Sequence, residues 1–143
     1  MENTESLVRN YLKRPEVQVM QLATVRDGQP WVCTVHFWAD DSMSFYWVSN
    51  PETRHSQEIE DGCKAAIAVV VNSVGKPIGI QAEGDAYLVE DMAELQRGAA
   101  GWASRHNRST DLGVKRLYKF APRLVTLFDT QSFPQDPRKV WHL

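Results

Sequence analysis

The fold of this chain is decided by residues 17–49, VQVMQLATVRDGQPWVCTVHFWADDSMSFYWVS. From Val17 to Val25 one mostly apolar face alternates with one mixed face, which is the pattern of a half-buried strand. Asp27-Gly28 follows, the strongest short signal for a β-hairpin. Trp31 to Ala39 is rich in aromatic and β-branched residues and predicts the return strand. After a polar turn, Ser44 to Ser49 predicts a third strand, so this stretch predicts an antiparallel meander.

Outward from the meander, short helices alternate with further strands. Thr4 to Arg14 has apolar residues at helical spacing and is followed by Pro15, so it predicts a short amphipathic helix. The later patterns predict a helix over 53–59, strands over 64–71 and 78–90, a helix over 91–104, a short helix over 109–117, a strand over 118–129 interrupted by Pro122, and an extended piece over 139–143. Gly79 and Gly84 lie inside a predicted strand, where glycine often marks a bulge or a bend.

The spacing of these strands indicates the fold class. Many short strands in 143 residues favour a sandwich or a barrel in one domain, residues 1–143. No G-x-G-x-x-G motif follows the first strand, which argues against a Rossmann sheet. We predict a mainly β (β+α) fold: a six- to seven-stranded antiparallel split β-barrel with flanking short helices. Side chains fill the interior of a small barrel, so a ligand of cofactor size has to lie outside it.

Composition and charge exclude several classes of function. Hydrophobic residues make up 43% of the chain and the net charge is −2, whereas general nucleic-acid binding needs a basic face. The longest apolar run, 65–71, is too short for a membrane span, and the N-terminus has no signal-peptide pattern, so we expect a cytoplasmic protein. Cys33 and Cys63 do not make a disulfide framework. Cys33 and His36 would point to opposite faces of a strand, so no metal site is predicted.

The sequence points to chemistry where the third predicted strand passes into the next helix. The free backbone N–H groups of a helix start suit an anion such as phosphate. Ser49 and Thr53 add hydroxyl donors, Arg54 adds a planar cationic fork, and His55 adds a further donor. An alternative stays open, in which Thr53 is a helix cap, Arg54 pairs with Glu58, and His55 is a surface residue.

Together with the strand order, these residues resemble the FMN-binding split-barrel superfamily, the pyridoxamine 5′-phosphate oxidase-like proteins. The resemblance covers roughly residues 5–130. It includes the turn Gly28-Gln29-Pro30 and the run GIQAEGDAYLVED that starts at Gly79. The tail from Arg138 to Trp141 is similar to the basic, Trp-containing end of small bacterial members.

The resemblance implies a homodimer that binds FMN at its subunit interface. The cofactor-binding residues it implies are Val32, Cys33, Thr34 and Val35 beside the ring, Val48 near the ribityl chain, Ser49, Thr53, Arg54 and His55 at the phosphate, Gln81 facing the ring, and Trp141 supplied by the partner subunit. For Gln81 an exposed strand position remains an alternative, and for Trp141 simple interface packing does. No acid, base or nucleophile stands out, so the catalytic residues stay unassigned.

Departures from the family pattern limit what the resemblance implies. His55 stands where many flavin-binding members have Lys, and the strand from Trp31 to His36 lacks the basic residues of the pyridoxamine phosphate oxidases themselves. We therefore expect a flavin-dependent oxidoreductase of another small molecule, not vitamin B6 oxidation. The alternatives are a deazaflavin, a haem with His106 or His142 as axial ligand, or a non-enzymatic flavin store or sensor. The basic residues near His106 also fit a solvated helix C-terminus.

Overall fold

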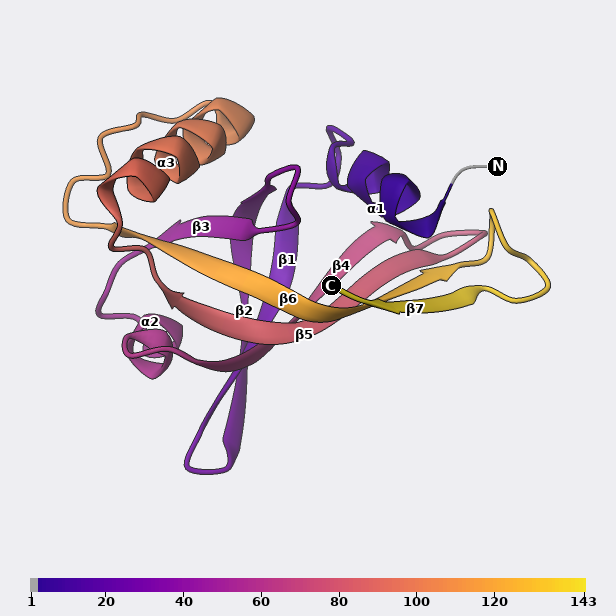
Figure 1. Ribbon diagram of the computed structural model, residues 1–143, viewed down its shortest axis with the longest axis horizontal. Helices are drawn as coiled ribbons and strands as arrows, with labels where there is room; N and C mark the ends of the chain where they lie inside the picture. The colour runs from indigo at the N-terminus through magenta and orange to yellow at the C-terminus, as the bar shows by residue number, and fades with distance from the viewer. Residues whose placement is uncertain (1–2) are drawn as a thin grey trace.

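The computed structural model describes residues 3–143, which form antiparallel strands flanked by helices (Figure 1). In chain order the elements are α1 (Thr4–Leu12), β1 (Val19–Arg26), β2 (Gln29–Ala39), β3 (Phe45–Ser49), α2 (Arg54–Ile59), β4 (Cys63–Asn72), β5 (Ile78–Leu88), α3 (Met92–His106), β6 (Arg116–Asp129) and β7 (Arg138–His142). Within residues 3–143, none of the helices has both the length and the apolar character needed to cross a membrane.

All the strands belong to one antiparallel sheet, in the order β3-β2-β1-β4-β5-β6-β7. β3 also pairs with β6, from Phe45 opposite Phe120 to Ser49 opposite Arg116, and this pairing closes β1 to β6 into a barrel. β7 lies beside the other half of β6, where Trp141 faces Val125. The predicted antiparallel split barrel and its N-terminal meander are both confirmed.

Large side chains fill the interior of the barrel. The largest of the fully buried side chains in this core are Trp47, Phe37, Phe45, Phe120, Met20 and Leu22. The Phe45 ring lies 5.6 Å from the Phe37 ring and 6.0 Å from the Phe120 ring, so aromatic packing joins β2, β3 and β6 where the barrel closes. Because protein interiors are close-packed, a cofactor has to bind outside this core.

α1 packs against one end of the barrel through its predicted apolar stripe. Val8, Tyr11 and Leu12 are buried. The Tyr11 hydroxyl donates a 2.5 Å hydrogen bond to Oδ2 of Asp129, which is fully buried at the end of β6. Asp129 Oδ1 also accepts from the backbone N–H of Ser132, so the carboxylate is hydrogen-bonded on both oxygens. Burial of a charged group is tolerated when it is satisfied in this way.

The hairpin of β1 and β2 extends beyond the barrel, at the lower edge of Figure 1. Asp27 and Gly28 both have positive φ, 52° and 75°, as the predicted two-residue turn requires. Gly84 lies at a register shift between β5 and β6, where Glu83 faces Leu124 and Gly84 faces Pro122. This confirms the bulge predicted at Gly84, and it lets β6 run through Pro122 without the predicted interruption.

The short helix predicted over 109–117 is wrong. α3 ends at His106 and is capped by Asn107, which has a left-handed φ of 53°. Side chains then cap successive turns: Ser109 Oγ accepts from the N–H of Asp111, and Asp111 accepts from the N–H of Gly113. Such local side-chain hydrogen bonds compete with helix formation. The strand begins at Arg116, because β3 offers it a pairing partner there.

Candidate functional site

A cleft of about 370 Å³ opens on the outside of the barrel, between β2, β3, the start of α2 and the C-terminal end of α3. We call it the α3 cleft. Its lining residues are Gln18, Thr34, Val35, His36, Val48, Ser49, His55, Trp102, His106, Arg108 and Lys115. Among the residues that the structure describes, no Asp or Glu lines this cleft, although Arg108 and Lys115 do. A cleft lined by charge of one sign concentrates ligands of the opposite sign, so this one favours an anion.

Ser49 and His55 face each other at one wall of the α3 cleft. His55 Nε2 lies 2.9 Å from Ser49 Oγ and 3.3 Å from Thr53 Oγ1. Thr53 caps α2 and accepts a hydrogen bond from the N–H of Ser56 at 3.3 Å. Burial lowers the pKa of His55, so the imidazole is mostly neutral at pH 7. This wall supplies hydrogen-bonding groups more than charge.

Arg54, placed at the same site by the sequence, points elsewhere. Its Nε donates a 2.8 Å hydrogen bond to Glu58, and its guanidinium carbon lies 4.1 Å from the centre of the Trp31 ring. Glu58 is buried and also accepts a hydrogen bond from Thr24 Oγ1 at 2.8 Å. The Arg54 hydrogen bond is the main cause of the lowered pKa of Glu58. The Arg54–Glu58 pair that the sequence left open is therefore present, and Arg54 is not among the residues that line the cleft.

Two other predicted positions, Val32 and Gln81, lie in a depression of about 400 Å³ on the outer face of the sheet. The depression is lined by Gln21, Ala23, Val32, Ala66, Ile67, Ala68, Gln81, Ala82, Glu83, Leu124 and Thr126. Thr34 Oγ1 donates a 2.7 Å hydrogen bond to Gln21, so the α3 cleft adjoins this outer-face depression along β2 and β1. Exposed valines lie on and near the outer-face depression. Val32, which lines it, is 60% exposed; Val70, two residues after Ala68, is 65% exposed; and Val140, opposite Thr126, is 55% exposed.

The remaining predicted residues are inward or partly buried. Cys33 packs against the core, and burial raises the pKa of its thiol to about 11, which keeps it protonated. Val35 is buried and Val48 is partly buried, and both line the α3 cleft. Trp141 packs against the core of its own chain, and its buried Nε1 makes no hydrogen bond within residues 3–143. Trp141 does not line the α3 cleft of its own chain.

Sequence reasoning did not place the end of α3 in the site. Trp102 Nε1 donates a 3.0 Å hydrogen bond to the carbonyl oxygen of His36, and His106 Nε2 lies 2.7 Å from the carbonyl oxygen of Phe37. The His36 and His106 rings meet edge to face at 5.3 Å. These contacts hold the end of α3 on the outer side of β2. The basic cluster around His106 was the available sequence signal, but a helix C-terminus explains such residues equally well.

Two partly buried histidines predict how stability changes with pH. Burial is the main cause of the lowered pKa values of His55 and His106. A lowered pKa means that the folded state binds the proton less tightly than the unfolded state, so stability is greatest above about pH 6.5 and falls as the pH drops further. We expect the wild type to lose stability between pH 7.5 and 5.5, and the His55→Gln, His106→Gln double variant to lose less. Urea unfolding across this range measures it, and parallel curves would contradict it.

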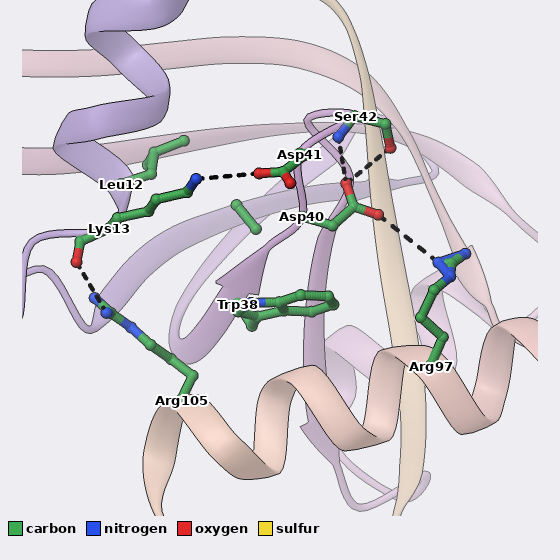
Figure 2. Close-up of a pocket in the computed structure, with 9 residues that line it drawn as sticks. Leu12, Lys13, Trp38, Asp40, Asp41, Ser42, Arg97 and Arg105 are labelled. Carbon is green, nitrogen blue, oxygen red and sulfur yellow. Dashed lines mark hydrogen bonds and ion pairs between the residues drawn. The ribbon is translucent and has the colours of Figure 1, made fainter.

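A second cavity, of about 430 Å³, lies between α1, the turn after β2, and α3 (Figure 2). Its charged side chains are already engaged with one another or with the backbone. Lys13 pairs with Asp41 at 3.1 Å and Arg97 with Asp40 at 3.9 Å, and Arg105 donates to the carbonyl oxygen of Lys13 at 3.1 Å. These contacts fasten α1 and α3 to the barrel. The unpaired cations of the α3 cleft make that cleft the better candidate for a ligand.

Metal binding finds no support in the side-chain arrangement. Within residues 3–143, no group of three or more His, Cys, Asp or Glu side chains is placed to hold a metal ion. The α3 cleft gathers the imidazoles of His36, His55 and His106, but His55 and His106 are each hydrogen-bonded within the protein. Both imidazoles therefore already have a hydrogen-bond partner within the fold.

Comparisons with known proteins agree with this architecture. A family model described as pyridoxamine 5′-phosphate oxidase matches residues 8–129. No curated protein matches the chain in sequence.

Solved structures share the fold at low sequence identity. A haem-binding protein from Mycobacterium smegmatis is 15% identical with a TM-score of 0.78, over 99% of this chain and 59% of that one. A protein from Listeria innocua that is assigned as a pyridoxamine 5′-phosphate oxidase is 19% identical with a TM-score of 0.72, over 87% of this chain and 98% of that one. An FAD-binding protein from Mesorhizobium loti is 15% identical with a TM-score of 0.68, over 87% of this chain and 92% of that one.

Proposed function

The chain belongs to the pyridoxamine 5′-phosphate oxidase family, and from this premise we propose that it binds FMN on the outside of its barrel. We further propose that it acts as a flavin-dependent oxidoreductase on a small molecule. The observation that carries the proposal is the α3 cleft, which has hydroxyl, imidazole and cationic groups and, among the described residues, no carboxylate. This composition fits a phosphate, because phosphate oxygens take hydrogen bonds from such donors.

The neighbourhood of the cleft also fits a flat ring. Thr34 and Val35 line the cleft, and Val32 continues along the same strand into the outer-face depression. A phosphate near Ser49 and His55 would leave the ring of the cofactor along β2 on the outside of the filled barrel. We therefore assign Val32 to Val35, Val48, Ser49 and His55 as cofactor contacts.

Thr53 and Arg54 would act indirectly, by holding the side of the α3 cleft that Ser49 and His55 form. Thr53 positions His55 through their contact, and Arg54 joins α2 to the β1–β2 hairpin through Trp31.

A second copy of the chain would cover the other side of the ring. The exposed valines near the outer-face depression lie on β2, β4 and β7 of the one sheet, and exposed apolar surface of this kind often marks a protein–protein contact. We propose that a homodimer forms through this face. Gln81 lies within it, so it would approach the cofactor at the interface. Trp141 lies on the inner side of β7, so it would reach a flavin ring bound to the partner subunit only if the C-terminal end of the chain moves.

Bound FMN would supply the hydride-transfer chemistry, and the protein would supply orientation and electrostatics. Ser49 and His55 would hold the phosphate end by hydrogen bonds. The hydroxyl of Thr34, fixed by Gln21, would present a polar group beside the ring. The thiol of Cys33 faces inward with a raised pKa, which argues against a nucleophilic role for it.

Flavin binding is tested by titrating the purified, ligand-free protein with FMN. We expect quenching of flavin fluorescence in the wild type and weaker binding, by about 10-fold, in Ser49→Ala, because a hydrogen bond to a charged group contributes about 1.5 kcal/mol or more. Ser73→Ala, in the loop after β4, serves as a control with unchanged affinity. Absence of any flavin signal in the wild type would rule out the proposal. Subsequent reduction by NAD(P)H would separate an oxidoreductase from a flavin store or sensor.

Haem is a second candidate, favoured by one contact. His106 Nε2 lies 2.7 Å from a backbone carbonyl oxygen, the partner that commonly fixes a metal-ligating imidazole, which leaves Nδ1 as the free ring nitrogen. His142, the other axial candidate, lies on β7 beside Leu124 and does not line the cleft. The absorption spectrum of the protein after haem addition distinguishes the candidates: a Soret shift lost in His106→Gln would favour haem, and flavin bands would favour FMN. The same measurement distinguishes a deazaflavin, because its absorption spectrum differs from those of FMN and haem.

A further inference from the structure

The charge of the α3 cleft comes from a part of the chain far from the motif that suggested a phosphate. Arg54 is hydrogen-bonded to Glu58 and does not line the cleft. His55 does line it, but burial lowers its pKa, and the same holds for His106. At neutral pH the permanent positive charges of the cleft are therefore those of Arg108 and Lys115.

The fold brings these two side chains into the same cleft as Ser49. Lys115 directly precedes Arg116, and Arg116 pairs with Ser49 across the seam between β3 and β6. Arg108 follows the left-handed Asn107, and its backbone N–H donates a 2.9 Å hydrogen bond to Ala103 at the end of α3. Both backbones are thus held by the elements that border the cleft.

Neither cation is neutralised by the protein. No carboxylate within residues 3–143 forms an ion pair with Arg108 or Lys115, and both side chains are exposed. The cations of the cavity in Figure 2 differ in this respect, since Lys13 and Arg97 face Asp41 and Asp40. Unpaired cations beside a hydrogen-bonding wall are what a doubly charged anion requires.

We propose that Arg108 and Lys115 complete the phosphate site of the α3 cleft and bind the phosphomonoester group of FMN together with Ser49 and His55. The proposal rests on the proposed function, flavin binding in this cleft. It assigns the cationic role to two residues outside the strand–helix motif. It also explains how a histidine can stand at position 55, because the charge that a lysine would bring there is supplied from the connection between α3 and β6.

Comparing FMN with riboflavin tests this assignment, because riboflavin lacks the phosphate. We expect the Arg108→Gln, Lys115→Gln double variant to bind FMN at least about 10-fold more weakly than wild type, with riboflavin affinity unchanged. The salt dependence of FMN binding should also weaken, since fewer charges contact the phosphate. Lys76→Gln, a cation in the loop after β4, is the matched control and should leave both affinities unchanged. Fluorescence titration at two salt concentrations gives all of these values.

The outcomes separate this proposal from the one on which it rests. If wild type binds neither flavin, the proposed function fails. If wild type binds FMN and the double variant binds it equally well, flavin binding stands and the assignment of Arg108 and Lys115 is overturned. An equal loss of FMN and riboflavin would also overturn it, because the two cations would then not act on the phosphate. Both side chains are exposed, and circular dichroism confirms that each variant is folded.

Discussion

An Ala68→Arg variant is expected to be monomeric and to bind FMN at least about 100-fold more weakly than wild type, since an uncompensated buried charge costs about 3–5 kcal/mol. Ala68 lies between Gln21 of β1 and Gln81 of β5, in the middle of the outer-face depression. Its side chain points away from the barrel core, so a longer one disturbs the isolated chain little. In the proposed dimer the same position would be covered by a second copy.

The expected loss of flavin follows from the filled barrel. Because FMN bound as proposed would lie outside the core, one chain would cover one side of its ring, and the partner would cover the other. Removing the partner would expose apolar ring surface to water and weaken binding. Size-exclusion chromatography with light scattering measures the mass, and fluorescence titration measures the affinity.

Met92→Arg provides the matched control for the Ala68 variant. Met92 is an exposed apolar residue at the start of α3, outside the outer-face depression. This variant should keep the oligomeric state and the FMN affinity of the wild type. A dimeric Ala68→Arg protein would show that the copies do not associate through this face. A monomer with undiminished FMN affinity would show that the cofactor needs no partner.

Gly84→Ala is expected to lower the free energy of unfolding by about 3 kcal/mol or more, at the upper end of what overpacking costs. A Cβ atom at this position would overlap the carbonyl oxygen of Ala121 and lie 2.8 Å from Cα of Pro122. These are backbone atoms of β6, so no side chain can rotate out of the way. The strand pair would have to open at this bulge.

Gly79, in the same strand, is the matched control for Gly84. A Cβ there would meet the carbonyl oxygen of Val69 at 3.7 Å, which is an ordinary contact. We expect Gly79→Ala to change the free energy of unfolding by less than about 1 kcal/mol. Urea denaturation of the two variants beside the wild type gives the comparison. Similar stabilities for both variants would contradict the close approach of β5 and β6 at Gly84.

Local patterns in the sequence predicted most of the elements. The alternation in 17–25, the Asp27-Gly28 turn and the aromatic return strand act over a few residues, and the structure has all of them. The bulge at Gly84 was also predictable, because glycine inside a strand has few other structural uses. The helix predicted over 109–117 was wrong, because hydrogen bonds of Ser109 and Asp111 favour turns there.

In the candidate site, too, some contacts follow from local sequence and others depend on the tertiary fold. Ser49, Thr53 and His55 are close in sequence, and their hydrogen bonds form within one strand–helix connection. The direction of Arg54 depends on Trp31, which the β1–β2 hairpin brings beside α2. The resemblance assigned Arg54 to the phosphate, and that assignment stays a prediction; its pairing with Glu58 depends on the fold and not on the linear pattern alone.

By itself the sequence determined the strands, the first hairpin and the cap of α2 at Thr53, since each depends on interactions between residues near in sequence. Tertiary structure alone decided that β3 closes on β6, and that closure places Lys115 beside Ser49 and the end of α3 over β2. It also decided that the unpaired cations of the cleft are Arg108 and Lys115. The sequence shows which side chains are charged, but whether a charge is neutralised depends on which distant carboxylates the fold brings near it.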